Sequence, residues 1–255
     1  MSGFSLRFLG HSTVRLDLGG RIVLTDPVLT ARVGGLVRVV PVPAPESYAD
    51  VDLVLLSHLH GDHLHLPSLR LLGSRTRIVV PRGAGTWLSK KGFERVEEIA
   101  PGETLTDGGL TVTATEAVHS GHRWGPRLTH GPQSPALGHL LESDGKKVYH
   151  AGDTDLFDGM SEIGPVDIGL IPIWGWGPGL GGGHLDPERA AQAVALIRPH
   201  TVVPIHWGTY FPIHLGLAGK PAFVDLPPAQ FAAAMAEHAP DVELRVLRVG
   251  DGTDF

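Results

Sequence analysis

The chain contains no cysteine among its 255 residues. Disulfide bonds are therefore excluded, and so is a metal ion held by thiolates. Any metal site has to be built from histidine, aspartate and glutamate. The absence of cysteine is also compatible with a cytoplasmic protein, since disulfides are typical of secreted ones.

Long apolar runs are missing as well. No stretch approaches the roughly 20 apolar residues that a membrane-spanning helix needs. The N-terminal segment 1–8 lacks the charged-then-apolar pattern of a signal peptide. We therefore expect a soluble, cytoplasmic protein without a transmembrane segment.

An excess of positive charge is absent too. Lys and Arg number 21 against 27 Asp and Glu, which gives a formal net charge of −6. This balance disfavours a protein that grips nucleic acid through its phosphates, whereas a small anionic substrate bound by a local arginine stays open. The length allows one large domain or two small ones. Because no segment has the composition of a linker, we expect a single domain spanning residues 1–255.

The apolar patterns predict an α/β protein with two central sheets. Many strands with helices at intervals recur in two halves of the chain. A proline-rich stretch at 41–45 is predicted as an extended loop or the edge of a lid. Strands are predicted at 4–9, 14–18, 21–25, 51–56, 77–80, 110–115, 136–143, 146–150, 168–173, 201–205 and 242–249, and helices at 66–72, 84–91, 187–197 with Asp186 as N-cap, and 228–238.

Fifteen histidines are present, and the most informative group is the run His58-Leu59-His60-Gly61-Asp62-His63. In extended backbone, residues two apart point to the same side, so His58 and His60 can reach one ion. The chain then turns at Gly61, and Asp62 and His63 can face a second ion. Imidazole and carboxylate together suit zinc or a similar divalent ion. The competing interpretation is a histidine-rich surface turn that binds nothing.

Three further candidates each follow a predicted strand: His119, Asp153 and His206. A carboxylate such as Asp153 can bridge two cations that lie about 3.5–4 Å apart. Taken singly, each of the three is more often structural. Taken with the histidine run, they form a coherent ligand set for two metal ions.

In this order, the segment 57–63, His119, Gly152-Asp153 and His206 resemble the signature of the metallo-β-lactamase superfamily, over nearly the whole chain. The resemblance implies an α/β fold, a four-layer αββα sandwich with two central mixed sheets and the site on one edge of them. A metal-bound hydroxide would be the nucleophile, because coordination lowers the pKa of water toward about 7. The resemblance implies that His58, His60 and His119 hold one metal, that Asp62, His63 and His206 hold the other, and that Asp153 bridges them.

Two segments near the N-terminus indicate which branch of the superfamily the chain resembles. Segments 9–13 (Leu-Gly-His-Ser-Thr) and 25–27 (Thr-Asp-Pro) are similar to the branch that contains L-ascorbate-6-phosphate lactonase and the phospholipase D acting on N-acyl-phosphatidylethanolamine. In that branch Asp26 would orient a ligand histidine, and His11 would act in the same way. The alternatives are a turn-capping role for His11 and simple turn chemistry for Asp26.

Other residues are candidates for contact with the substrate. His184, in a glycine-rich run before the helix 187–197, is assigned to substrate contact or proton transfer, which makes it catalytic together with Asp62; otherwise it is a helix-start residue without a role. Arg123 would bind a phosphate through its planar guanidinium, or it is a solvated loop residue. Trp174 and Trp176 would form a pocket wall, or they pack on the core.

These features together predict a metal-dependent hydrolase in which a metal-bound hydroxide attacks a small phosphodiester, a phosphorylated lactone or a related ester. The cofactors would be two divalent ions, with zinc as the default for a His/Asp cage and manganese, iron or nickel as alternatives. The partner would be a small anionic molecule, and a homo-oligomer stays open.

Three competing hypotheses remain. An RNA-processing nuclease of the same fold is disfavoured by the short, acidic chain. A non-enzymatic metal or small-ligand binding protein is disfavoured by the complete set of seven ligand candidates. A di-iron oxidoreductase would need an electron-carrier domain, which the sequence does not indicate.

Overall fold

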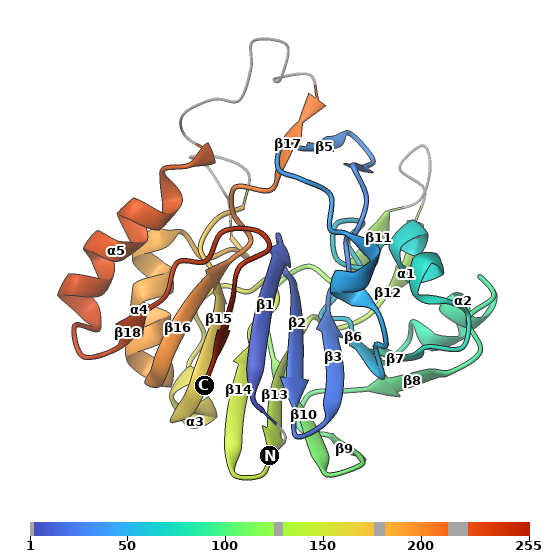
Figure 1. Ribbon diagram of the computed structural model, residues 1–255, viewed down its shortest axis with the longest axis horizontal. Helices are drawn as coiled ribbons and strands as arrows, with labels where there is room; N and C mark the ends of the chain where they lie inside the picture. The colour runs from blue at the N-terminus through green and yellow to red at the C-terminus, as the bar shows by residue number, and fades with distance from the viewer. Residues whose placement is uncertain (1–2, 125–129, 176–181, 214–223) are drawn as a thin grey trace.

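Two seven-stranded sheets face each other at the centre of the computed structural model, which describes residues 3–124, 130–175, 182–213 and 224–255 (Figure 1). The first sheet has the strand order β19 (Gly252–Asp254), β1 (Ser5–Gly10), β2 (Thr13–Leu18), β3 (Arg21–Thr25), β6 (Leu53–Leu55), β7 (Arg77–Pro81) and β8 (Val96–Ile99). The second has the order β18 (Glu243–Leu244), β16 (Pro199–Ile205), β15 (Val166–Pro172), β14 (Lys146–His150), β13 (Leu137–Ser143), β10 (Leu110–Glu116) and β9 (Thr104–Asp107).

An apolar core fills the space between the sheets. It draws on alternate residues of both, such as Leu16 and Leu55 from the first sheet and Val112, Ile168 and Val203 from the second. Successive side chains of a strand point to opposite faces, so a period of two in apolar residues gives each strand one face for this core. Burying these side chains supplies the main driving force for joining the two sheets.

Helices cover the outer faces of the sandwich. The short helices α1 (Leu66–Leu72) and α2 (Gly85–Ser89) pack on the first sheet, and α3 (Met160–Ile163), α4 (Pro187–Ile197) and α5 (Pro227–His238) pack on the second (Figure 1). Helix α4 begins as its sequence predicts, because the Asp186 side chain accepts a hydrogen bond of 2.8 Å from the backbone N–H of Arg189. The arrangement confirms the predicted four-layer αββα sandwich.

The strand directions bring several chain segments to one edge. β3, β6 and β7 run parallel, as do β14, β15 and β16. β1 is antiparallel to β2, and β2 is antiparallel to β3, so β1 runs in the same direction as β3. In the same way β10 runs in the same direction as β14, because β13 is antiparallel to both. The residues that follow the ends of β1, β3, β6, β10, β14 and β16 therefore meet at one edge of the sandwich.

Several elements differ from the prediction. The strand expected at 242–249 is only the two-residue β18, and β19 follows it after a separate loop. The edge strands β8 and β9 were not expected, because they expose one side and lack a clear apolar pattern. The proline-rich stretch ends in a 3-10 helix at Pro45–Tyr48. Small sheets were also missed: β17 (Tyr210–Pro212), β5 (Leu36–Arg38) and β4 (Arg32–Val33) form one, and β11 (His122–Trp124) and β12 (His130–Gln133) form another.

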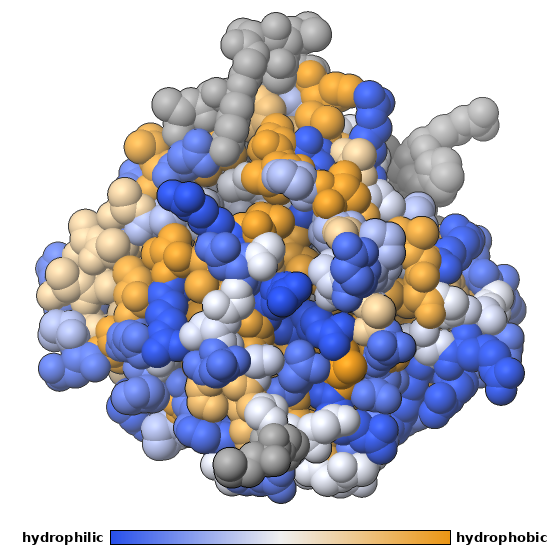
Figure 2. Space-filling model, in the orientation of Figure 1, coloured by the Kyte–Doolittle hydropathy of each residue, from blue (hydrophilic) through white to orange (hydrophobic). Residues whose placement is uncertain are grey.

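The surface agrees with this layering. Arg7, Arg15 and Asp17 alternate with buried residues on β1 and β2, and Figure 2 shows hydrophilic side chains across the lower part of this face. Hydrophobic side chains gather toward the end where β17 and β5 lie. Within the described ranges, no helix is long and apolar enough to cross a membrane.

Gly152, just after β14, has a backbone conformation that only glycine adopts easily. Its φ is +61°, and a Cβ there would lie 2.5 Å from the Ser57 Cβ and 2.8 Å from the Leu137 carbonyl oxygen. This close approach places the following Asp153 against the loop after β6.

We predict that Gly152→Ala lowers the free energy of unfolding by about 1–3 kcal/mol more than Gly145→Ala does, because only the former adds a steric overlap. Gly145 is the matched control: its φ is +79°, and a Cβ there would meet nothing within 4 Å. Urea denaturation of both variants measures the difference. Equal losses would show that the crowding at Gly152 is relieved without cost.

Candidate metal centre

The edge where the strand ends meet carries the polar residues of the site. His11 follows β1, Asp26 follows β3 and His206 follows β16. All three have a positive φ, of 57°, 35° and 61° respectively, which is unusual for residues other than glycine. The backbone N–H of His206 donates a 2.9 Å hydrogen bond to the carbonyl of His11, so the two sheets are joined directly at the site.

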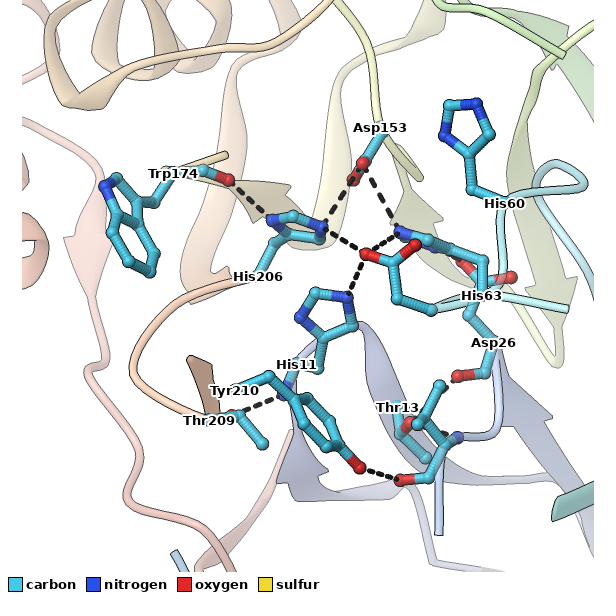
Figure 3. Close-up of polar contacts among 12 residues, drawn as sticks. His11, Thr13, Asp26, His60, His63, Asp153, Trp174, His206, Thr209 and Tyr210 are labelled. Atoms are coloured by element: carbon cyan, nitrogen blue, oxygen red, sulfur yellow. Dashed lines mark hydrogen bonds and ion pairs between the residues drawn. The ribbon is translucent and has the colours of Figure 1, made fainter. Parts of the chain in front are cut away.

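Four side chains surround one point on this edge. Asp153 Oδ2 lies 3.2 Å from His206 Nε2 and 3.3 Å from His63 Nε2 (Figure 3). Asp62 Oδ2 lies 3.8 Å from His206 Nε2 and 3.9 Å from His63 Nε2. Ligand atoms around a tetrahedral zinc ion are about 3.3–3.6 Å apart. The distances of Asp153 from His63 and His206 are close to that range, and Asp62 lies slightly farther out, in a group of ligand atoms within 4.8 Å of one another that also holds His63 and His206.

A second group adjoins the first. The ligand nitrogens of His58, His60 and His119 all lie within 4.8 Å of one another, and His119 Nε2 is 3.1 Å from His60 Nδ1. Ligand atoms of His58, His63 and Asp153 form a further such group. Asp153 thus stands between the two halves, and its Oδ1 is buried without a hydrogen bond in the described part of the chain. An oxygen in that position is available to a second ion.

Hydrogen bonds to protein acceptors orient the histidine rings. His63 Nδ1 donates to Asp26 Oδ2 at 2.8 Å, His119 Nδ1 to the Gly183 carbonyl at 2.5 Å, and His206 Nδ1 to the Trp174 carbonyl at 2.5 Å. Because each Nδ1 carries the proton of these bonds, the lone pair of each neutral ring is on Nε2. Those Nε2 atoms face the centre, as metal ligation requires.

Ser57 completes this pattern for His58. The Ser57 hydroxyl donates to Asp26 Oδ2 at 2.6 Å, so its oxygen accepts from His58 Nδ1 at 3.0 Å. His58 Nε2 is then buried without a hydrogen-bond partner among the described residues. A buried polar atom in that state is costly unless a ligand occupies its open side. The donor set, all nitrogen and carboxylate oxygen, therefore fits divalent ions such as zinc.

The histidine pKa values differ between the two groups of ligand candidates, the one of His58, His60 and His119 and the one beside Asp153. Burial lowers the pKa of His58 well below its usual value, and burial with the neighbouring His119 lowers that of His60 to about 4. Burial also lowers the pKa of His119, although Asp153 opposes it. These three rings are therefore neutral at pH 7.

The histidines beside the carboxylates, His63 and His206, have raised pKa values instead. Burial lowers the pKa of His63, but Asp153 and Asp26 outweigh it and raise that pKa well above its usual value. Burial likewise lowers the pKa of His206, and Asp153 outweighs it, so the net shift is upward. Burial raises the pKa of Asp153, yet His206 and His63 bring it well below the usual range. Without metal, this half carries paired charges.

His11 and Asp26 lie beside the ligand candidates. His11 Nε2 donates to Asp62 Oδ2 at 3.1 Å, and its backbone N–H donates to Thr209 Oγ1 at 2.7 Å. The ligand nitrogen of His11 also falls within the group formed by Asp62, His63 and His206. The contact of Asp26 with His63 is the one that an orienting role requires. Each of the two residues therefore contacts a ligand candidate, Asp62 or His63.

His184 lies at the mouth of the site. Its Nδ1 is 3.6 Å from Asp153 Oδ2, and its ring meets that of His119 edge to face at 4.6 Å between centroids. About 20% of the side chain is exposed, whereas His63 and His206 are buried. Burial lowers its pKa despite Asp153, so the ring is neutral near pH 7.

Two residues predicted to contact the substrate, Arg123 and Trp174, have contacts within the protein. Arg123 Nη1 donates to the carbonyls of Leu59 (2.9 Å) and Leu64 (2.7 Å), so this arginine clamps the ligand loop. That Arg123 binds a phosphate of the substrate stays a prediction, and it applies only to the guanidinium nitrogens other than Nη1. The Trp174 side chain is 6% exposed and lies in an apolar cluster with Phe211, which favours the alternative that it packs on the core. Trp176 lies outside the described residues.

The acceptors that orient the histidine rings have no clear signal in the sequence. The carbonyls of Trp174 and Gly183 belong to loops whose path cannot be read from composition. The adjacency of Ser57 to His58 was the one signal that could have identified an acceptor. The remaining contacts join residues more than 30 positions apart.

Comparison with known proteins supports this description. A family model described as a beta-lactamase superfamily domain matches residues 21–207. The chain is 35% identical over 218 residues to a UPF0173 metal-dependent hydrolase of Pyrococcus abyssi (82% of this chain, 86% of the relative), and 35% identical over 212 residues to one of Thermus thermophilus (82% and 85%). Among solved structures it is similar to Igni18, a metallo hydrolase from Ignicoccus hospitalis, with a TM-score of 0.73, 27% identity and coverage of 99% and 98%.

We predict that metal-free protein at pH 7 binds two zinc ions with different proton release. An ion at His58, His60 and His119 meets neutral rings and displaces few protons. An ion at the other group must displace the protons of His63 and His206, whose pKa values are raised.

Isothermal titration calorimetry in two buffers of different ionisation enthalpy gives the protons released per ion. The difference between the two steps should shrink as the pH is raised, because His63 and His206 then lose their protons before zinc is added. Equal release in both steps at pH 7 would contradict the assignment of charge to the two halves.

Proposed function

The chain belongs to the beta-lactamase superfamily, and on that premise we propose that it is a metal-dependent hydrolase with a centre for two divalent ions. The relatives named above are called metal-dependent hydrolases, which supports the reaction class. The observation that carries the two-ion centre is the convergence of ligand atoms from both sheets, with Asp153 between the two groups.

Divalent ions bound there would act as Lewis acids toward a carbonyl or phosphoryl oxygen and lower the pKa of a coordinated water. The residues of the chain supply the geometry. Asp26 and the carbonyls of Gly183 and Trp174 hold the histidine rings in one tautomer and orientation. Asp62 Oδ2 receives the N–H of His11, which keeps that carboxylate turned toward the centre.

The charge balance favours an anionic substrate. The donor set contains only two carboxylates, Asp62 and Asp153, beside five imidazoles that are neutral once they bind metal. Two divalent ions therefore leave a net positive charge at the centre, in a place where burial makes charges interact strongly. We propose a small phosphodiester, a phosphorylated lactone or a related ester as the substrate class, with zinc as the default metal.

His184 is positioned to handle a proton or to contact the substrate. Its ligand atom forms a group with those of His119 and Asp153, all within 4.8 Å of one another, but its side chain is more exposed than those of His63 and His206. A neutral imidazole can accept a proton through one nitrogen and donate a hydrogen bond through the other. We therefore place His184 at the substrate side of the centre, outside the ligand set.

The decisive experiment is metal analysis of the purified protein followed by a substrate panel of a phosphodiester, a lactone, a carboxylic ester and a short RNA. Turnover of one of the first three in the metal-loaded protein supports the proposal. Preference for the RNA would favour the nuclease alternative. A metal-loaded protein that is inert on the whole panel would favour a binding protein.

We predict that Asp62→Ala lowers kcat by at least about 100-fold on whichever panel substrate is turned over, a larger loss than residues behind the ligands usually cause. Asp158→Ala, an exposed aspartate in the loop after β14, is the control and should keep full turnover. Kinetics are compared at equal metal content. Unchanged turnover of Asp62→Ala under that condition would remove Asp62 from the centre.

We predict that His184→Gln lowers kcat by roughly 10²–10⁴-fold while both ions stay bound, because a proton-transfer or substrate contact is lost and no ligand is. His200→Gln, at an exposed histidine of β16, is the matched control. Metal content and kcat are measured on the same samples. Loss of one ion in His184→Gln would instead make His184 a metal ligand.

A further inference from the structure

Asp155 lies behind the metal centre and contacts three segments that carry site residues. Its carboxylate Oδ2 accepts a 3.1 Å hydrogen bond from the backbone N–H of Gly183. Its own backbone N–H donates to the Val118 carbonyl at 3.0 Å. Asp155 is two residues from Asp153, Val118 precedes His119, and Gly183 precedes His184. The side chain and the backbone of this one residue therefore contact the neighbours of His119 and His184, two positions along the chain from Asp153.

The contact with the N–H of Gly183 matters because the carbonyl of the same residue orients a ligand histidine. The Gly183 carbonyl accepts the hydrogen bond from His119 Nδ1 that leaves the Nε2 lone pair of His119 facing the centre. Gly183 has a φ of +93°, and a Cβ there would lie 3.2 Å from His119 Nδ1. The position therefore holds a glycine pressed against the ring, and its carbonyl has to be aimed accurately.

Apart from the burial of Leu185 in the core that packs on the second sheet, the backbone of this segment has few contacts that fix it. Among the described residues, no backbone–backbone hydrogen bond involves residues 182–185. The carboxylate of Asp155 is itself held: it accepts from its neighbour Leu156 N–H at 2.7 Å and pairs with Arg189 on α4. Its side chain is only 13% exposed. A fixed acceptor thus anchors a segment that has few other bonds.

The other side of Asp155 is ordered as well. The backbone N–H of Val118 donates to Thr154 Oγ1 at 2.9 Å, while Asp155 N–H bonds back to the Val118 carbonyl. The residue before His119 is therefore held by two bonds to the Thr154-Asp155 pair. Both the ring of His119 and the carbonyl that orients it are placed by the same short segment.

We propose that Asp155 is a positioning residue that sets the tautomer of His119, and the place of His184, by holding the backbone N–H of Gly183 and so fixing the residue whose carbonyl accepts from His119. It acts through Gly183 and touches neither metal nor substrate. The proposal rests on the metal centre proposed above, because the Nε2 lone pair of His119 has this use only where an ion is bound.

Nuclear magnetic resonance of the imidazole rings in ¹⁵N-labelled, zinc-loaded protein tests it. His119 and His206 both donate from Nδ1 to a backbone carbonyl at 2.5 Å, so both Nδ1 protons should be visible in the wild type. Asp155→Ala should lose the His119 Nδ1 proton to solvent exchange and keep that of His206. The affinity for one of the two zinc ions should fall by about 10–100-fold.

Asp158→Ala is the matched control, an exposed aspartate in the same loop, and it should change neither resonance. Asp155→Asn keeps an oxygen acceptor but loses the charge and the pair with Arg189. In that variant the His119 resonance should persist with faster exchange, and this comparison carries the test if Asp155→Ala does not fold.

A His119 resonance and zinc affinity that stay at wild-type values in both Asp155 variants would overturn the proposal. Loss of both the His119 and His206 resonances would also overturn it, since the effect would then not run through Gly183. Failure of the proposed function looks different: wild-type protein would be inert on the substrate panel while the Asp155 variants still changed the His119 ring.

Discussion

The orientation of the ligand histidines depends first on the fully buried carboxylate of Asp26. It accepts hydrogen bonds from the backbone N–H and the hydroxyl of Ser57, at 2.8 and 2.6 Å, and from His63 Nδ1 at 2.8 Å. Burial raises the pKa of Asp26, yet His63 and the hydrogen bonds outweigh it and keep the carboxylate charged. Through Ser57 it orients His58 as well, so one buried charge aligns a ligand candidate in each half of the site.

Around this charge, the protein uses the two nitrogens of each histidine differently. Nδ1 is committed to a protein acceptor, and Nε2 faces the centre, in His58, His63, His119 and His206. Such an arrangement leaves buried polar atoms that favour bound cations, and it holds the rings before any ion arrives. The left-handed backbone at His11 and His206, joined by a hydrogen bond, is local strain at the same point.

Much of the fold followed from local patterns. The alternation in 14–18 and the apolar run before Ser57 predicted strands that the structure contains, and Asp186-Pro187 predicted the start of α4. The elements that were missed are short edge strands and the small sheet of β17, β5 and β4. Their pairing depends on partners distant in sequence, so their own residues carry little apolar signal. The tail after β18 illustrates the same limit, because only its contact with β1 makes Gly252–Asp254 a strand.

By itself, the sequence determined the chemistry that is available: a chain without cysteine, with His58, His60, Asp62 and His63 at the end of a buried strand and His119, Asp153 and His206 after others. Residue type and spacing are enough for that, since strand ends of one direction share an edge of the sheet. Only the tertiary structure decided which nitrogen of each ring faces inward, that Arg123 clamps the ligand loop, that Trp174 packs in the interior and that Asp155 holds Gly183. These outcomes depend on carbonyls and carboxylates that the packing of the two sheets brings close. Every residue has a backbone carbonyl, so residue type does not show which carbonyl will accept a hydrogen bond from a given ring.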